Sequence, residues 1–338
     1  MNRNYWAVVL LAVALVCGCK DSDEQSKSNS ATQPAQAGSG RGRKVVIGMV
    51  AKSQSNDVFQ AAHRGADDAA KELGAKYGVE VEVNWQTPDR EDAAQQAQAI
   101  EQLARGGAQA ITVSCSDANT VTPAIDRAVD LGVPVMCFDS DAPKSKRFCF
   151  FGTDDEQCGQ AVMDKLAEVM GKKGNIDVLA GNQAAPNLQR RVNGVKQALQ
   201  KYPDIKIIDV VNHEETAEQA AIAVNQAQST TNPHIDGWAM VGGWPLFAQN
   251  ALKWDPGTVK VVSVDALPPE LAYLESGYVQ ALYMQHCYDW GYKSVQILLD
   301  KVVNNKNPEQ ERLIDKLELI TKDDAPRVRE LWRKWLGK

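Results

Sequence analysis

Residues 45–50 read VVIGMV, an apolar run with no polar alternation. Such a run is typical of a parallel β-strand that is buried on both faces. The residues that follow, 57–73, carry apolar side chains at helical spacing, with Asp57 as the expected N-cap and Gly74 as the expected stop. A buried strand followed by a helix is half of a βαβ unit, so this stretch predicts a parallel sheet covered by helices.

The same alternation continues along the chain and predicts further units. In the first half we expect strands at 79–85, 110–114 and 133–138, and helices at 89–103 and 119–131. After a turn-rich stretch at 139–147 we expect strands at 148–151, 176–179, 205–211, 235–241, 259–264 and 278–283. The helices of this second half are expected at 156–170, 188–201, 217–229, 245–252 and 289–303. Two doubly wound series predict an α/β protein of two lobes, each of about 150 residues.

The C-terminal residues 324–336 form a separate pattern. Val328, Leu331, Trp332 and Trp335 recur at helical spacing among charged residues. This spacing predicts an amphipathic helix whose apolar face packs on a lobe, with the basic side chains in solvent.

The N-terminus predicts export. A polar start with one positive charge, Arg3, precedes an apolar run at 5–16 that is too short to span a bilayer. The run ends in VCGC at 16–19, which resembles a bacterial lipobox. We therefore expect a signal peptide at 1–18, lipidation of Cys19, and a polar flexible tether over 19–43 that holds the protein at a membrane, facing the periplasm or the cell exterior. The alternative is an ordinary signal peptide with a chance cysteine.

The composition argues against several functions. A formal net charge of −6 argues against a nucleic-acid partner. The chain has no GxGxxG after its first strand, no GxSxG and no P-loop, and its four histidines lack ligand spacing. We therefore expect no enzyme activity, no cofactor and no metal site.

The cysteines beyond the lipobox form no CxxC pair, which argues against a zinc or thioredoxin-type site. They are Cys115, Cys137, Cys149, Cys158 and Cys287. Cys137 lies in an apolar run and is expected in the core. A disulfide between Cys149 and Cys158 is left open.

An ordered set of motifs resembles the type I periplasmic binding proteins, in particular the ribose-like, sugar-binding receptors of ABC importers. The set consists of VIGMVAKS at 46–53 with Asn56 and Phe59, GVPV at 132–135, FDSDAP at 138–143, FGTD at 151–154 and VVSVD at 261–265. The resemblance implies two Rossmann-like lobes joined by three crossovers, near Thr153, Gln285 and Leu317. It implies a first lobe of residues 44–152 and 286–316, and a second lobe of 153–285 and 317–322, followed by the C-terminal helix at 323–338.

The resemblance also implies a ligand site in the cleft between the lobes. Strand ends and the residues after them supply carboxylates, amides, a guanidinium and aromatic rings, which suit a sugar's hydroxyls and C–H faces. The candidate ligand-binding residues are Lys52, Asn56, Phe59, Asp139, Asp141, Asn187, Gln189, Arg190, Arg191, Trp244, Asp265 and Gln285. Asp139 and Asp265 each follow an apolar strand, where open α/β sheets bind ligands.

Departures from the ribose receptors leave the sugar open. Val58 precedes Phe59 where that group has two adjacent aromatics, and Ser140 stands where it has an arginine. Its ligand arginine falls nearest Gln189, and Trp244 lies where it has an asparagine–aspartate pair. Lys52 with the acidic DSD at 139–141 is similar to a branch that binds a furanosyl autoinducer or rhamnose, although that branch's aspartate–glutamine pair is absent near Asn187.

We therefore expect a receptor for a small sugar or polyol, with a deoxysugar or furanosyl autoinducer as the alternative ligand. The expected partner is the permease of an ABC importer, or else a chemosensor. We expect a monomer. A transcription regulator of similar lobes would need an N-terminal helix-turn-helix, where this chain has a signal and a tether.

Overall fold

The computed structural model describes residues 43–337. The predicted signal peptide, the lipidation site Cys19 and nearly all of the tether lie outside these residues. Within the described part, no helix combines the length and the apolar character needed to cross a bilayer.

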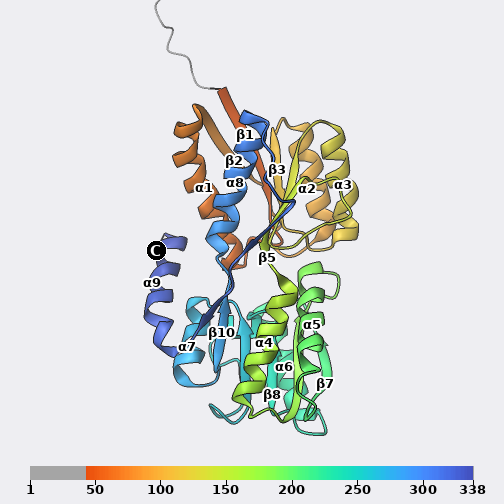
Figure 1. Cartoon of the computed structure of the whole chain (residues 1–338), viewed down its shortest axis with the longest axis vertical. Coiled ribbons are helices and arrows are strands. Elements are labelled where there is room, and N and C mark those ends of the chain that lie inside the picture. The colour runs from red at the N-terminus through yellow and green to blue at the C-terminus, as the bar shows by residue number, and fades with distance from the viewer. Residues whose placement is uncertain (1–42, 338) are drawn as a thin grey trace, which may run out of the picture. The chain divides into compact units, whose positions relative to one another are not determined.

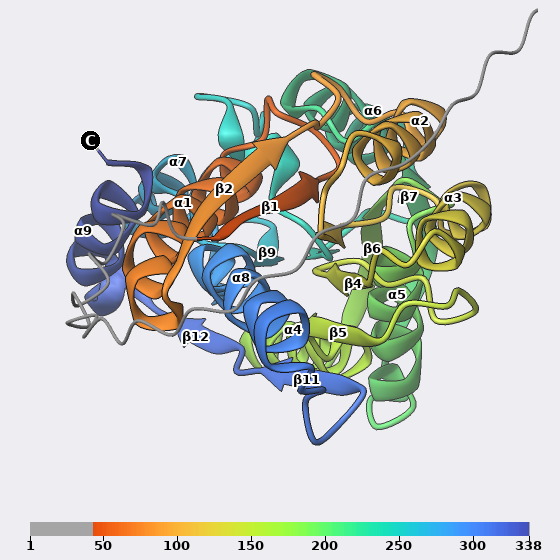
Figure 2. The same ribbon diagram turned by 90° about the horizontal axis from the view of Figure 1, so that it is seen from above.

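The first lobe is built on a six-stranded parallel sheet (Figure 1). Its strands are β1 (Arg43–Val50), β2 (Val79–Trp85), β3 (Ala110–Val113), β4 (Val135–Phe138), β5 (Cys149–Thr153) and β11 (Arg312–Asp315), in the order β11-β5-β4-β3-β1-β2. Its helices are α1 (Asp57–Tyr77), α2 (Ala93–Arg105), α3 (Ala118–Asp130) and α8 (Cys287–Asn304). Seen from above, α1 and α8 cover one face of the sheet, while α2 and α3 cover the other (Figure 2).

The second lobe repeats this plan. Its strands are β6 (Gly174–Gly181), β7 (Ile205–Asn212), β8 (Gly237–Met240), β9 (Lys260–Val264), β10 (Ala281–Met284) and β12 (Glu318–Ile320), in the order β12-β10-β9-β8-β6-β7. Its helices are α4 (Asp155–Val169), α5 (Pro186–Leu199), α6 (Ala217–Thr230), a 3₁₀ turn η1 (Trp244–Phe247) and α7 (Pro268–Ser276). The two doubly wound series predicted from the sequence are confirmed, but the strand expected at 148–151 as the first of the second series is β5 of the first sheet. However, β12 pairs antiparallel with β10, so the second sheet is not wholly parallel.

The chain passes between the two sheets three times. It leaves β5 at Thr153 and enters α4, and it leaves β10 at Met284 and enters α8. It then runs from β11, which ends at Asp315, into β12, which begins at Glu318. These three crossings lie side by side at one edge of the cleft described below, and they join the two lobes.

Glycines allow one helix pair in each lobe to make close backbone contact. A Cβ at Gly159 of α4 would overlap the carbonyl oxygen of Arg191, and a Cβ at Gly194 of α5 would overlap that of Glu156. In the first lobe, a Cβ at Gly291 of α8 would likewise overlap the carbonyl oxygen of Ala62 in α1. Only glycine permits backbones to approach this closely, so these residues set the position of α5 and α8.

The structure corrects several predicted element boundaries. Helix α1 begins after Asn56, whose side chain accepts a hydrogen bond from the Val58 amide, so Asn56 rather than Asp57 is the N-cap. The helix passes through Gly74 and ends at Gly78 in the left-handed conformation, because a single glycine inside a well-packed helix costs only ~1 kcal/mol. The helix expected at 245–252 is only the 3₁₀ turn η1, which an extended Ala248 ends.

Three elements were not predicted. Helix α7 begins with two prolines, which read as a turn but also fit the first turn of a helix. Strands β11 and β12 are short and lie at the sheet edges, where apolar patterning is weak.

The C-terminal helix α9 (Ala325–Leu336) is amphipathic, as its spacing predicts. Val328 and Trp332 are fully buried, and Trp335 stacks on Tyr288 of α8 with ring centroids 6.3 Å apart. Arg329 on the same helix pairs with Glu275 of α7 at 2.9 Å. Helix α9 therefore contacts both lobes.

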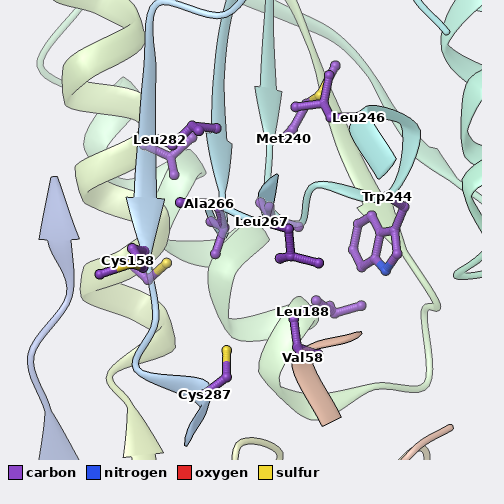
Figure 3. Packing of buried hydrophobic residues seen from close by; sticks show 14 of the residues in the cluster. Val58, Cys158, Leu188, Met240, Trp244, Leu246, Ala266, Leu267, Leu282 and Cys287 are labelled. Carbon is purple, nitrogen blue, oxygen red and sulfur yellow. The ribbon is translucent and has the colours of Figure 1, made fainter. Parts of the chain in front are cut away.

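The cores hold the described cysteines as free thiols. Cys115, Cys137, Cys149, Cys158 and Cys287 are all buried and unpaired. The disulfide between Cys149 and Cys158 that the sequence left open is therefore not formed in this structure. Cys158 and Cys287 pack near Leu282 and Ala266, beside the end of the second sheet (Figure 3).

Candidate functional site

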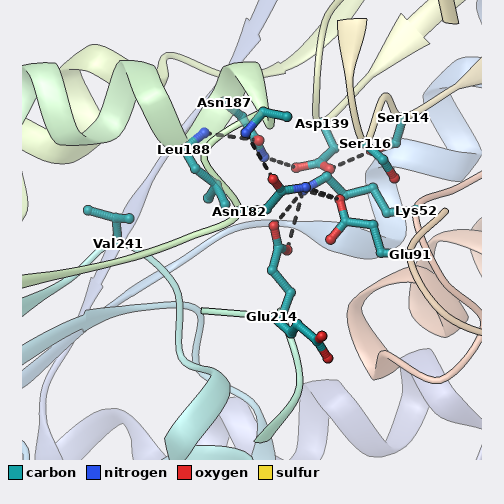
Figure 4. Close-up of polar contacts among 12 residues, drawn as sticks. Lys52, Glu91, Ser114, Ser116, Asp139, Asn182, Asn187, Leu188, Glu214 and Val241 are labelled. Atoms are coloured by element: carbon teal, nitrogen blue, oxygen red, sulfur yellow. Dashed lines mark hydrogen bonds and ion pairs between the residues drawn. The ribbon is translucent and has the colours of Figure 1, made fainter. Parts of the chain in front are cut away.

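The carboxyl ends of the strands in the two sheets face each other, and polar side chains meet there (Figure 4). Asp139 directly follows β4 in the first lobe, and Asn187 lies in the first turn of α5 in the second. The Nδ2 atom of Asn187 donates to Oδ1 of Asp139 at 3.3 Å. The other oxygen of Asp139 accepts from the hydroxyl of Ser114 at 2.6 Å. Asp139 is 4% exposed, so these contacts lie inside the cleft rather than at its rim.

Asp139 and Asp265 occupy matching positions in the two lobes. Each is the first residue after an apolar strand, β4 for Asp139 and β9 for Asp265. Both adopt the left-handed backbone conformation, with φ of 54° and 77°. This conformation costs of order 1 kcal/mol or more for a residue other than glycine, and such strain collects at functional sites. The strain turns each carboxylate out of its strand and toward the cleft.

A second polar network lies deeper in the cleft, around Gln285 between β10 and α8. Its Nε2 donates to Asp265 at 2.8 Å, and its Oε1 accepts from Arg191 at 2.7 Å and from Thr153 at 2.9 Å. Arg191 also donates to Asp155 at 3.0 Å. Burial raises the pKa of Asp155 to about 7, although the neighbouring Arg191 opposes the shift. Two of the three crossings, at Thr153 and at Gln285, are thus joined through one amide.

Lys52 forms the charged wall of the cleft. Its Nζ lies 3.2 Å from Oε1 of Glu215 in the second lobe and 3.6 Å from Oε1 of Glu91 in the first. Asn182 of the second lobe donates to the same Glu91 oxygen at 3.3 Å. Burial lowers the pKa of Lys52, but the two glutamates outweigh it, and the net shift is upward. The lobes are therefore joined by an ion pair as well as by the Asp139–Asn187 hydrogen bond.

An open cavity of about 660 Å³ adjoins these networks and is lined by both lobes. Its volume lies within the range of small-molecule pockets. The lining includes Lys52, Asn56 and Phe59 from the first lobe, and Asn182, His213 and Glu215 from the second. Trp244 supports the second-lobe wall, with its ring edge-on to His213 at 4.9 Å.

The structure brings together most of the predicted site residues. Those that line the cavity or its polar networks are Lys52, Asn56, Phe59, Asp139, Asn187, Arg191, Asp265 and Gln285. Trp244 lies just behind them. Of the three candidates in α5 for an arginine position, Arg191 is the one whose guanidinium reaches the network, through Gln285.

Three predicted residues neither line the cavity nor make a hydrogen bond to its polar networks. Gln189 precedes Arg191 by two residues, so the helical period places it on the outer face of α5, where it is exposed and donates to Gln183. Arg190 is half-buried, and its Nε has no partner within residues 43–337. Asp141 is held inside the first lobe by Arg147 and by Arg312, whose Nη1 is 2.8 Å away. Three of the roughly four acceptor sites of its carboxylate are thereby engaged.

The sequence reasoning missed Glu91 and Glu215. Both lie in loops that follow edge strands of the two sheets, β2 and β7. The rule that selected Asp139 and Asp265 takes the polar residue directly after a strand, and it misses both because Glu91 lies six residues after β2 and Glu215 three residues after β7.

Comparisons with known proteins agree with this arrangement. A family model described as a periplasmic binding protein domain matches residues 47–306. A D-ribose/D-allose-binding protein of Pseudomonas aeruginosa is 24% identical over 277 residues, which cover 79% of this chain and 84% of that protein. A D-apiose import binding protein of Actinobacillus succinogenes is 26% identical over 294 residues, covering 84% of this chain and 90% of that protein.

A xylitol-binding protein of Mycolicibacterium smegmatis is 28% identical over 199 residues, and the match spans 58% of this chain and 57% of that protein. Among solved structures, a solute-binding protein of an ABC transporter from Burkholderia graminis, in complex with D-arabinose, superposes with a TM-score of 0.76 at 24% identity. That superposition covers 84% of this chain and 97% of the other, and it shows a shared fold.

Proposed function

This chain belongs to the periplasmic binding protein domain family, and from that premise we propose that it captures a small sugar or sugar-like polyol for an ABC importer. The family is one of binding proteins rather than enzymes, which agrees with the lack of catalytic motifs in the sequence. The ligand is held in the cleft between the lobes, and the lobes close around it.

One observation carries the proposal. Asp139 and Asp265 leave matching strand ends in a strained backbone conformation. Asp139 contacts Asn187, while Asp265 and Arg191 meet at Gln285 in a second buried network. Carboxylates accept hydrogen bonds, guanidinium groups donate them and amides do both, which matches sugar hydroxyls that each donate and accept. Phe59 offers an apolar ring at the cavity wall. Xylitol, D-ribose, D-allose, D-apiose and D-arabinose, which are named for the similar proteins, share this polyhydroxylated chemistry.

The second candidate ligand is a deoxysugar or furanosyl autoinducer. Its support is the similarity of Lys52, which lines the cavity, and of the acidic DSD at 139–141 to the branch that binds such ligands. A partner other than a permease is the second candidate for the receiving protein, since one structure of similar fold is a complex of XylFII with LytSN. We further propose that lipidated Cys19 holds the protein at the membrane.

A thermal-shift screen tests the ligand class. Pentoses, hexoses, deoxysugars, polyols and the furanosyl autoinducer are added singly to the purified chain, and a ligand that binds only the folded state raises the melting temperature. We expect a neutral pentose or polyol to give the largest shift. A response to the autoinducer or to a deoxysugar alone would select the second candidate, and no response to any of them would reject both. Calorimetry on the Asp139 variants described below then places the ligand in the cleft.

A further inference from the structure

A cluster of side chains with metal-ligand chemistry lies at the crossings between the lobes, outside the cleft networks. His286 follows Gln285 at the second crossing, Asp289 lies in the first turn of α8, and Asp315 ends β11 at the third crossing. One ligand atom from each of the three lies within 4.8 Å of the others. Side chains that are distant in sequence are thus gathered at the point where two crossings run side by side.

The contacts orient these atoms toward one point. The Nδ1 atom of His286 lies 3.2 Å from Oδ2 of Asp315. The other oxygen, Oδ1, accepts from the backbone amide of Lys316 at 2.8 Å, which turns Oδ2 to the imidazole. The Asp289 carboxylate, half-buried in the same cluster, makes no hydrogen bond or ion pair with any residue in the described range.

An ion pair between His286 and Asp315 does not account for the whole cluster. Three carboxylates, those of Asp289, Asp315 and Glu318, surround one imidazole. Glu318 is also paired with Arg327, and Lys293 lies one turn beyond Asp289, so part of the negative charge is balanced. The Asp289 carboxylate, which makes no hydrogen bond or ion pair among the described residues, is not explained by the His286–Asp315 pair.

The second ring nitrogen of His286 also has a suitable partner. Its Nε2 lies 3.6 Å from Oε2 of Glu318, the first residue of β12. Histidines that bind a metal through one nitrogen usually donate the other N–H to a carboxylate, which fixes the tautomer and the ring orientation. If Nδ1 binds a cation, Glu318 fills that role.

We propose that His286, Asp289 and Asp315 bind Zn²⁺ at this position, with Glu318 as the acceptor from the outer imidazole N–H. One imidazole nitrogen and two carboxylates suit Zn²⁺, whereas Mg²⁺ and Ca²⁺ prefer oxygen ligands alone. Bound Zn²⁺ has ligand distances of about 2.0–2.2 Å, so rotation of the three side chains must draw their atoms closer together. Because the ligands come from two crossings, the ion stiffens the connection between the lobes, independently of which ligand the cleft binds.

Melting curves of the full chain, purified without an affinity tag and stripped of metal with a chelator, test the proposal. We expect Zn²⁺ to raise the melting temperature by a few degrees at ~100-fold excess over its dissociation constant, and a chelator to reverse the shift. Mg²⁺ and Ca²⁺ at the same concentration should give little or no shift. No response to Zn²⁺, or a larger response to Ca²⁺, overturns the assignment.

Asp289→Asn separates a metal site from a structural ion pair. Because the Asp289 side chain has no partner in the described structure, the amide should preserve the fold and the His286–Asp315 contact. It removes a metal ligand, so calorimetry should show Zn²⁺ binding weakened by at least ~10-fold. Unchanged Zn²⁺ affinity in Asp289→Asn overturns the proposal, because the histidine pair would then suffice.

A second histidine–aspartate pair supplies the matched control. His63 and Asp67 on α1 lie 3.7 Å apart, and within the described residues no third ligand joins them. His63→Ala should therefore leave the zinc response intact, and its loss would place the ion elsewhere and overturn the proposal. Co²⁺ gives an independent readout: its visible absorption on binding should appear in the parent chain and in His63→Ala, but not in Asp289→Asn.

Discussion

Asp139 and Asn187 belong to different lobes, yet the amide of Asn187 donates to the carboxylate of Asp139 at 3.3 Å across the cleft. Ser114 holds the other oxygen of Asp139 from within its own lobe. An ionised carboxylate has about four acceptor sites, so both contacts leave room for ligand hydroxyls. Asp139 thus accepts one hydrogen bond within the first lobe and one from the second, and it retains acceptor sites for a ligand that contacts both lobes.

Replacement of Asp139 should weaken ligand binding strongly. A hydrogen bond to a charged group contributes about 1.5–3 kcal/mol, so removal of the carboxylate should cost about 2–4 kcal/mol, or roughly 30- to 1,000-fold in affinity. Asp139→Asn is the cleaner variant, because asparagine tolerates the left-handed backbone that alanine does not. We expect calorimetry to show this loss while the ligand-free melting temperature of Asp139→Asn changes little.

Gln189→Ala is the control for Asp139→Asn. Gln189 was also predicted at the site, but it lies on the exposed outer face of α5, so its loss should leave affinity unchanged. The assignment of the cleft as the ligand site is wrong if Asp139→Asn binds the ligand as tightly as the parent chain does. It is also wrong if Gln189→Ala binds the ligand less tightly than Asp139→Asn does.

A separate prediction concerns the close contact of Gly159 in α4 with the backbone of α5. Gly159→Ala should push α5 away from α4, because the new Cβ would overlap the carbonyl of Arg191. Overpacking of this kind typically costs about 1–3 kcal/mol of stability. Since α5 carries Arg191 and Asn187, we also expect weaker ligand binding, measured by calorimetry below the melting temperature.

Gly291→Ala in the first lobe provides the comparison. It introduces the same overlap between α8 and α1, against Ala62, and should lower the melting temperature to a similar extent. It leaves α5 in place, so ligand affinity should fall less than in Gly159→Ala. Equal losses of affinity in both variants would show that general destabilisation, rather than the position of Arg191, governs binding.

The sequence predicted the parallel sheets well because their strands are continuous apolar runs, such as 45–50 and 261–264, that only burial on both faces explains. It also predicted Asp139 and Asp265, since a polar residue directly after such a run must lie at the sheet's carboxyl edge. The edge strands β11 and β12 were not predicted, because short edge strands need little apolar sequence. Their position depends on pairing with β5 and β10, which only the tertiary fold provides.

The sequence did not predict which side chains pair with one another. Asp141 has the same residue type and nearly the same position as Asp139, but Arg312, 171 positions later, turns it away from the cleft. Lys52 was predicted as a ligand residue, whereas its ion pair with Glu215 depends on how the lobes meet. Local pattern specifies strand ends, but it does not specify which distant charges face them.

The lipid anchor can be tested apart from the fold. Lipidation of Cys19 should make the native protein partition into detergent, and Cys19→Ser should move it to the aqueous phase. Cys17→Ser is the matched control, because it changes the neighbouring cysteine and leaves the modified position intact. If Cys19→Ser and the parent chain partition alike, the lipoprotein assignment is wrong.

The last prediction concerns pH. Burial raises the pKa of Glu215 from 4.5 to about 7, even though Lys52 opposes the shift. Three carboxylates, those of Glu91, Glu215 and Asp139, surround the single ammonium of Lys52, so retention of one proton is physically reasonable. A carboxyl group with a raised pKa binds its proton more tightly in the folded chain than in the unfolded one. Its contribution to stability is therefore fully present below pH 4.5, and it is lost as the pH rises through about 7.

Glu215→Gln mimics the protonated group and should remove this fall, which we estimate at roughly 1–3 kcal/mol between pH 5 and 7.5. Urea unfolding at the two pH values measures it. Glu214→Gln changes the adjacent, exposed glutamate and should keep the pH dependence of the parent chain. A Glu215→Gln variant that keeps the full pH dependence would show that another group titrates in this range.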